Sequence, residues 1–130
     1  FGNRADSFNR VLRLWVADSP FGPFTEHCAS PIRISPAGAR TGGAILNHGS
    51  SLYRAGQDLS RAYGDGLVLF RIEALSRDAY REVETGRLRF RSHHGPHTLN
   101  IREGKALFDY YDDQLSPLAG FRRLRQSRAG

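Results

Sequence analysis

Several residue types are scarce or missing in this chain of 130 residues, and each shortage excludes a class of protein. Methionine is absent, so a chain that begins Phe-Gly-Asn-Arg is expected to be a piece of something longer. The single cysteine, Cys28, excludes an internal disulfide framework and a zinc site with several cysteines, and it leaves the compartment undetermined. The longest apolar run, residues 67–70, is far shorter than the roughly 18 residues of a membrane helix, so we expect no membrane segment in this chain.

Positive charge is abundant, and nearly all of it is arginine. Lysine and arginine number 19 against 13 acids, and Lys105 is the only lysine. A basic chain raises the possibility of nucleic-acid binding. However, the arginines are spread along the chain among acids, and neither a recognition motif nor interleaved aromatic residues accompany them. We therefore expect no nucleic-acid partner. One group, Arg87, Arg89 and Arg91, alternates and is predicted to lie on one face of a strand.

Short apolar segments separated by glycine and proline dominate the sequence and favour β-structure. Strands are expected at residues 11–17, 24–27, 43–47, 51–54, 66–75, 80–84, 97–101 and 106–111. Residues 28–40 contain two prolines and are expected to be a loop, whereas residues 48–50 are typical of a tight hairpin turn. The pattern predicts an all-β fold and leaves sandwich, barrel and propeller open.

Three stretches resemble known families. The first, Leu-Trp-Val-Ala-Asp-Ser-Pro-Phe-Gly-Pro-Phe-Thr-Glu-His ending at His27, is similar to a unit of five-bladed β-propellers of the glycoside hydrolase 43 type. The second combines Ala-Arg-Thr-Gly-Gly, Leu-Tyr-Arg-Ala-Gly-Gln-Asp and Tyr-Gly, and the third is Gly-Pro-His-Thr-Leu-Asn ending at Asn100. Together the three stretches resemble the propeller domain at the N-terminus of plant glucosamine inositolphosphorylceramide transferases and related bacterial proteins. Ala55 departs from the family pattern, which has proline there.

The resemblance implies a partial five-bladed β-propeller. A blade has about 40–50 residues, so this chain holds two to three blades rather than a full ring. Residues 1–111 are expected to form this part of the propeller, with the missing N-terminal blades as its partners. Residues 112–130 are expected to be a C-terminal tail, with a short helix over residues 118–126 as one alternative.

Six side chains in the resembling stretches are candidates for a site in the central funnel. Arginine is a rigid fork of donors and suits sugar hydroxyls or a phosphate, and a tyrosine ring suits stacking on a sugar. The expected ligand-binding residues are Arg40, Arg54, Gln57, Tyr63 and His97, and the candidate catalytic residue is Asp58. Alternatives stay open: Arg54 and Asp58 would pair and hold a loop, Arg40 and Tyr63 would be ordinary surface or rim residues, and His97 would pin a neighbouring blade by a hydrogen bond.

Other chemistry finds less support. His93, His94 and His97 do not follow an established ligand spacing, so we expect neither a metal nor another cofactor. Glycoside hydrolysis uses two carboxyl groups, and Asp58 is the only acid in a motif. Acids in the expected strands, among them Glu82, are predicted to lie on exposed faces.

The leading hypothesis is therefore a carbohydrate-associated propeller module of a glycan-processing protein, which binds a sugar or sugar phosphate in its funnel. A transferase or glycosidase activity would belong to the longer protein, and this piece alone is expected to be inactive. One alternative is a glycoside-hydrolase-like enzyme whose second carboxylate lies in missing blades. Another is a scaffold propeller without ligand chemistry.

Overall fold

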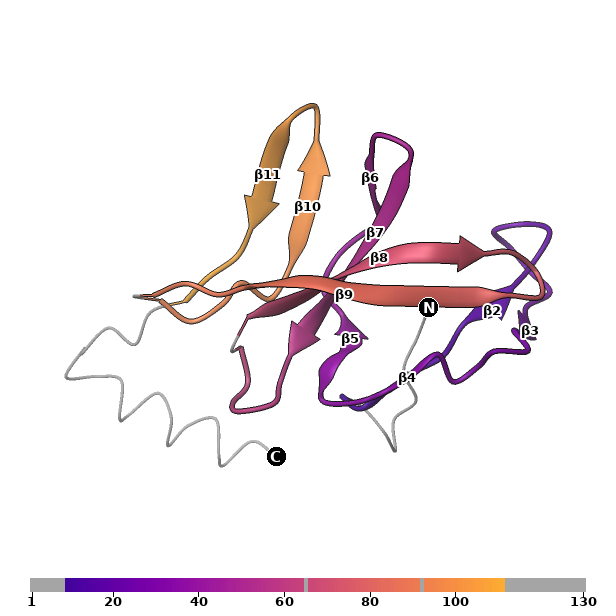
Figure 1. The fold of residues 1–130 in the computed structure, drawn as a ribbon, viewed down its shortest axis with the longest axis horizontal. Coiled ribbons are helices and arrows are strands. Elements are labelled where there is room, and N and C mark those ends of the chain that lie inside the picture. The colour runs from indigo at the N-terminus through magenta and orange to yellow at the C-terminus, as the bar shows by residue number, and fades with distance from the viewer. Residues whose placement is uncertain (1–8, 65, 92, 112–130) are drawn as a thin grey trace.

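The computed structural model describes residues 9–64, 66–91 and 93–111, and this part of the chain is all-β (Figure 1). Its strands are β1 (Val11–Leu12), β2 (Trp15–Val16), β3 (Thr25–Glu26), β4 (Arg33–Ile34), β5 (Ala37–Thr41), β6 (Leu46–His48), β7 (Ser51–Asp58), β8 (Leu67–Leu75), β9 (Tyr80–Leu88), β10 (Leu99–Arg102) and β11 (Lys105–Phe108). No helix in the described ranges is long and apolar enough to cross a membrane.

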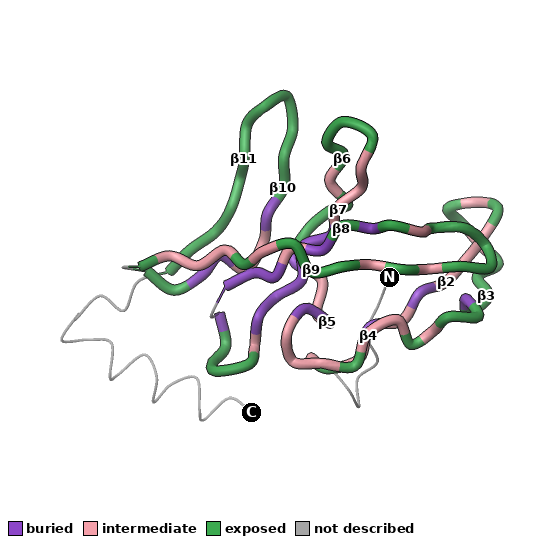
Figure 2. Tube along the Cα trace, viewed as in Figure 1, coloured by how far each residue is buried: buried purple, intermediate pink, exposed green. Residues whose placement is uncertain are grey.

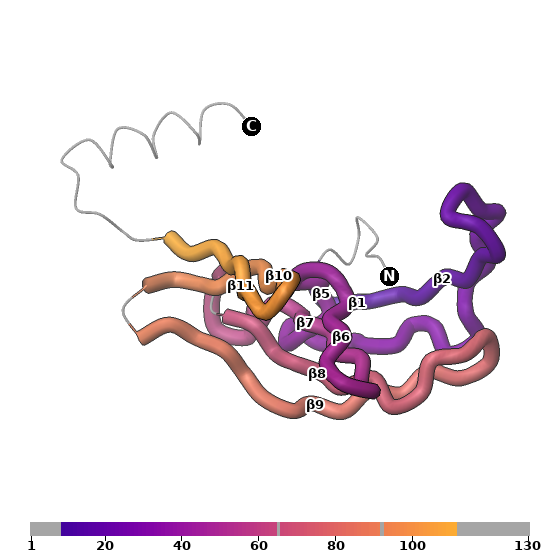
Figure 3. The backbone as a smooth tube through the Cα atoms, turned by 90° about the horizontal axis from the view of Figure 1, so that it is seen from above, coloured from indigo at the N-terminus to yellow at the C-terminus, as the bar shows by residue number. Residues whose placement is uncertain are grey.

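The central element is an antiparallel sheet with the strand order β5-β7-β8-β9, in which β6 also pairs with β7. The long strands β7, β8 and β9 follow one another along the chain and pair as a meander. Three two-stranded sheets surround it: β1 with β4, β2 with β3, and β10 with β11. Among the described residues none of these sheets closes on itself. The β6–β7 and β10–β11 hairpins project to the same side of the central sheet in Figure 1, and they lie next to each other when seen from above in Figure 3.

The core lies where the strands cross, and the projecting hairpins are exposed (Figure 2). Ala55, Leu67 and Leu99 form a buried cluster from three different strands. At the first pairing of the sheet, β5 and β7 approach so closely that a Cβ on Gly56 would lie 2.3 Å from the carbonyl oxygen of Gly38. Glycine at position 56 therefore permits the close approach of β5 to β7.

Several strand predictions are confirmed. Residues 66–75 and 80–84 lie almost entirely in β8 and β9, and His48 pairs with Ser51 across the expected tight hairpin. The expected strand over residues 11–17 is instead divided, because β1 pairs with β4 and β2 pairs with β3. The expected short helix over residues 118–126 lies outside the described residues.

The loop prediction for residues 28–40 is wrong, because this segment contains β4 and most of β5. Pro36 separates the two strands, and each strand finds its partner elsewhere in the chain: β4 pairs with β1, and β5 pairs with β7. The small residues of β5 give it little apolar alternation. Its strand conformation follows from pairing with β7.

Candidate functional site

Three of the predicted binding residues, distant in sequence, lie next to one another. Arg40 belongs to β5, Tyr63 to the loop after β7, and His97 to the segment before β10. The Arg40 guanidinium carbon lies 5.8 Å from the centre of the Tyr63 ring. The Tyr63 and His97 rings are 5.2 Å apart, centre to centre. The structure thus gathers a cation, an aromatic ring and an imidazole from three segments.

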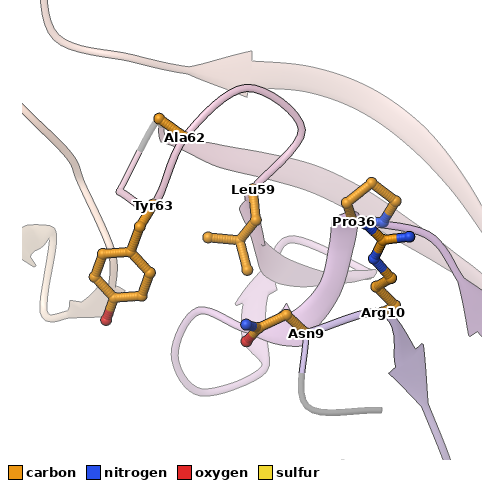
Figure 4. Close-up of a pocket in the computed structure, with 6 residues that line it drawn as sticks. All are labelled: Asn9, Arg10, Pro36, Leu59, Ala62 and Tyr63. Atoms are coloured by element: carbon orange, nitrogen blue, oxygen red, sulfur yellow. The ribbon is translucent and has the colours of Figure 1, made fainter.

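A pocket of about 240 Å³ borders this group. Figure 4 shows Tyr63 at one end of the pocket and Arg10 at the other, with Leu59 between them. The lining residues are Asn9, Arg10, Pro36, Leu59, Ala62 and Tyr63. Arg40 reaches this lining through Asn9, because its Nη1 donates a hydrogen bond of 3.0 Å to Asn9 Oδ1.

The loop that carries Tyr63 comes close to His97 because of a glycine. Gly64 has φ +76°, and a Cβ at this position would lie 2.5 Å from His97 Nε2. The other ring nitrogen, Nδ1, lies 3.2 Å from Asp109 Oδ2. The His97 ring also stacks on Tyr111 at 5.5 Å. His97 is therefore held from several sides, while the Tyr63 ring stays largely exposed.

Asp109 fixes the backbone that carries His97. Its Oδ1 accepts hydrogen bonds from the backbone N–H groups of His97 (2.9 Å) and Thr98 (2.7 Å). Burial alone would raise the pKa of Asp109, but these backbone hydrogen bonds outweigh it and lower the pKa below its ordinary value. The carboxylate is therefore ionised at neutral pH.

Arg54 does not face this pocket group; it lies in a buried ion network. Its Nε donates to Glu82 Oε2 at 2.8 Å and its Nη2 to Glu82 Oε1 at 2.7 Å, while its Nη1 donates to the Gly38 carbonyl at 2.7 Å. Arg33 Nε (2.8 Å) and the Tyr80 hydroxyl (2.6 Å) donate to the same carboxylate. The exposed face predicted for Glu82 is therefore wrong: its side chain is 4% exposed, because β9 turns it toward Arg54.

The same network encloses an aromatic ring. The guanidinium carbons of Arg33 and Arg54 lie 4.0 Å and 4.5 Å from the centre of the Phe70 ring. Burial would raise the pKa of Glu82, but its hydrogen bonds from Arg54 and the charge of Arg54 lower it overall. Glu82 is therefore ionised at neutral pH and compensates the buried Arg54 and the partly exposed Arg33.

Asp58 forms a second network, at the end of β7. Its Oδ2 accepts hydrogen bonds from Arg87 Nη1 (3.0 Å) and Arg89 Nη2 (2.6 Å), and its Oδ1 accepts from the Ser60 backbone N–H and hydroxyl. The suggested pairing of Arg54 with Asp58 is thus wrong, because each has other partners. The shared face predicted for Arg87 and Arg89 is confirmed, since both reach one carboxylate.

Desolvation would raise the pKa of the fully buried Asp58, but the hydrogen bonds from Ser60 and Arg89 and the charge of Arg87 lower it. Gln57 is also buried, and its Oε1 has no hydrogen-bond partner among the described residues. The six predicted site residues therefore divide into a pocket group (Arg40, Tyr63 and His97) and a buried group (Arg54, Gln57 and Asp58).

Sequence reasoning missed several residues that build the site. Asn9 and Arg10 precede the resembling stretches, and no motif marks them. Asp109 and Glu82 act on residues far away in sequence, so only the fold reveals their partners. No group of three potential metal ligands gathers anywhere in the described part of the chain.

Similarity to known proteins covers most of the chain. Residues 1–108 match the family described as glucosamine inositolphosphorylceramide transferase 1, N-terminal. The chain is 44% identical over 77 residues to glucosamine inositolphosphorylceramide transferase 1 of Oryza sativa subsp. japonica, and 41% identical over 78 residues to that of Arabidopsis thaliana. Each alignment spans 58% of this chain and 10% of the relative, so the chain matches about a tenth of the length of these proteins. No solved structure matches it.

Proposed function

The chain belongs to the N-terminal family of glucosamine inositolphosphorylceramide transferase 1, and from this we propose that it is a carbohydrate-binding module of a glycan-processing transferase. Its ligand in this proposal is a sugar or sugar phosphate. The relatives' names contain two such groups, glucosamine and inositol phosphate.

The observation that carries the proposal is the meeting of Arg40, Tyr63 and His97 beside a pocket. A sugar has apolar C–H faces and hydroxyl edges, so it needs a flat ring to stack on and donors around its rim. Tyr63 offers an exposed ring, and Arg40 offers a rigid fork of N–H donors beside it. The His97 ring, 5.2 Å from the Tyr63 ring and tilted against it, supports the position of the tyrosine.

The fold proposed for the module is part of a five-bladed propeller. The antiparallel order β5-β7-β8-β9 supports this, because a propeller blade is a four-stranded sheet of this kind. In such a blade β5 would be the strand nearest the funnel, and it carries Arg40. The β10–β11 hairpin would then contribute to a neighbouring blade.

Arg54, Gln57 and Asp58 have a supporting role in this proposal. All three are buried, and the two charged residues are fully engaged with protein partners. A catalytic role for Asp58 stays a prediction. It would require the carboxylate to become accessible, because a catalytic group must touch the reacting atoms.

Titration calorimetry with Tyr63→Ala tests the proposal. The probes are myo-inositol, myo-inositol 1-phosphate and glucosamine, added to the full chain. Loss of the stacking ring removes about 1 kcal/mol, so we expect binding of the preferred probe to weaken roughly five- to tenfold.

Tyr110→Ala is the matched control, because Tyr110 and Tyr63 are equally exposed (58% and 59%) and Tyr110 does not line the pocket. The control should bind like the wild type. If none of the probes binds the wild type, or if both variants weaken binding equally, the proposed function is wrong.

A further inference from the structure

We propose that the pocket selects an anionic, phosphorylated ligand and that Arg10 binds the phosphate. The inference rests on the proposed function and deepens it, because it chooses between a neutral sugar and a sugar phosphate. It also adds a binding residue that the sequence motifs do not contain.

The first argument is the pairing of the arginines. Carboxylates pair with most arginines of the described chain: Arg13, Arg33, Arg54, Arg71, Arg77, Arg81, Arg87, Arg89 and Arg102. Arg10 has no such partner within the described ranges, although it lines the pocket. Arg40, next to the same pocket, bonds to the neutral amide of Asn9. Among the described residues, no carboxylate therefore compensates the positive charge beside the pocket.

The second argument is the donor chemistry of the lining. None of the described residues that line the pocket is acidic. Asn9 uses its Oδ1 to accept from Arg40, so its Nδ2 group remains available as a donor. Arg10 adds a fork of N–H groups that matches phosphate oxygens. Such a set of donors suits a ligand rich in acceptors better than a neutral polyol, which must also donate.

The third argument is the shape and polarity of the pocket. Leu59 lies between Arg10 and Tyr63, and Pro36 and Ala62 add apolar surface to the lining (Figure 4). Apolar walls strengthen a charged hydrogen bond by lowering the local dielectric constant. The volume of about 240 Å³ lies just below the roughly 300–1,000 Å³ of drug-sized pockets. The pocket is therefore small, and the ligand we propose for it is a single sugar ring with one phosphate.

Backbone contacts fix Arg10 independently of its side chain. The Arg10 carbonyl accepts a hydrogen bond of 2.7 Å from the Ser35 N–H, which holds the residue at the start of β1 against the end of β4. The side chain itself makes no ion pair in the described structure, so its replacement should not disturb folding. Arg10→Gln is therefore a clean test of charge at the pocket.

The experiment compares myo-inositol with myo-inositol 1-phosphate by calorimetry on the full chain. We expect the wild type to bind the phosphorylated probe at least tenfold more tightly, and Arg10→Gln to lose most of this preference. Arg10→Lys keeps the charge without the fork and should give an intermediate affinity. Higher salt should weaken the binding of myo-inositol 1-phosphate and leave the binding of myo-inositol unchanged.

Arg102→Gln is the matched control, since Arg102 lies on β10 outside the pocket and is almost fully exposed. It removes the same charge and should leave the phosphate preference intact. A further arm uses phosphatidylcholine vesicles with and without phosphatidylinositol. Arg10-dependent sedimentation with the second kind assigns the phosphate to a lipid headgroup, and its absence assigns it to a free sugar phosphate.

The outcomes separate the inference from the proposed function. If myo-inositol binds as tightly as its phosphate in a Tyr63-dependent manner, the function stands and the inference is overturned. The inference also fails if Arg10→Gln keeps the preference, or if Arg102→Gln loses it equally. If neither probe nor glucosamine binds, both proposals are overturned.

Discussion

Replacing Glu82 with glutamine should remove a large part of this protein's free energy of unfolding. Glutamine has nearly the same shape, but it removes the charge and turns one acceptor into a donor that faces other donors. The four hydrogen bonds to the carboxylate come from Arg54, Arg33 and Tyr80. Arg54 is 1% exposed and would keep its charge in the interior without a carboxylate.

The expected loss follows from the burial of the pair. Removing one partner of a buried ion pair destabilises a protein by about 3–5 kcal/mol. Arg33 is partly exposed and recovers some hydration, so the lower end of this range applies. Because a domain is stable by only about 5–15 kcal/mol in total, a loss of about 3 kcal/mol is large.

Urea unfolding of Glu82→Gln and Glu84→Gln measures the effect. Glu84 lies on the same strand and undergoes the same chemical change, but its pair with Arg87 is exposed and should contribute less than about 1 kcal/mol. A Glu82→Gln variant within 1 kcal/mol of Glu84→Gln would refute the reasoning that the buried network holds the sheet.

The pH dependence provides a second readout. The pKa of Glu82 is lowered in the folded protein. Its contribution to the free energy of unfolding is therefore fully present above the ordinary pKa of 4.5 and is lost as the pH falls through the pKa of the folded state. The difference between wild type and Glu82→Gln should therefore shrink below about pH 4.5. A difference that stays constant down to pH 3 would contradict the assignment.

Two further predictions concern the same sheet. Asp58→Asn should destabilise the protein by roughly 1–3 kcal/mol, less than Glu82→Gln, because Arg87 and Arg89 are partly exposed and can regain water. Urea unfolding measures this loss, and an unchanged free energy of unfolding would contradict the contacts of Asp58. Gly38→Ala places a Cβ 2.5 Å from the Phe70 ring at a residue with φ +87°. It should lower the thermal midpoint by several degrees more than Gly49→Ala, because Gly49 also has a positive φ but has open space around it. Equal midpoints of the two variants would argue against the clash.

Local pattern was enough to predict the strands that carry their own apolar alternation. Residues 66–75 show it after the apolar run of residues 67–70, and the glycine at 49 marks the hairpin before β7. β5 lacks it: Ala-Gly-Ala-Arg-Thr has the composition of a loop, and only the glycine contact with β7 makes it a strand. Its position was thus decided by tertiary pairing, which sequence pattern does not contain.

The site divides in the same way. Arg40, Tyr63 and His97 were predicted from separate motifs, and each proved to lie near the others because the strands bring their segments together. The partners of Arg54 and Asp58 were not predictable from the sequence. The side chains of β9 alternate between its two faces, and the sequence alone does not show which face is buried. Which acid of β9 points inward depends on the register of β9 against β8.

The two buried networks explain why residues that resemble a site in sequence lie beside the pocket rather than in it. Asp58 ends β7 and caps the following loop through Ser60, and this loop supplies Leu59 and Tyr63 to the pocket. Arg54, four residues earlier on β7, ties that strand to β9 and, through the Gly38 carbonyl, to β5, which carries Arg40. Both networks thus fix elements that present the pocket side chains. If this is their role, Asp58→Asn should weaken ligand binding only as far as it loosens the Tyr63 loop, and it should add no further loss in a Tyr63→Ala background. A direct contact between Asp58 and the ligand would instead make the two losses add.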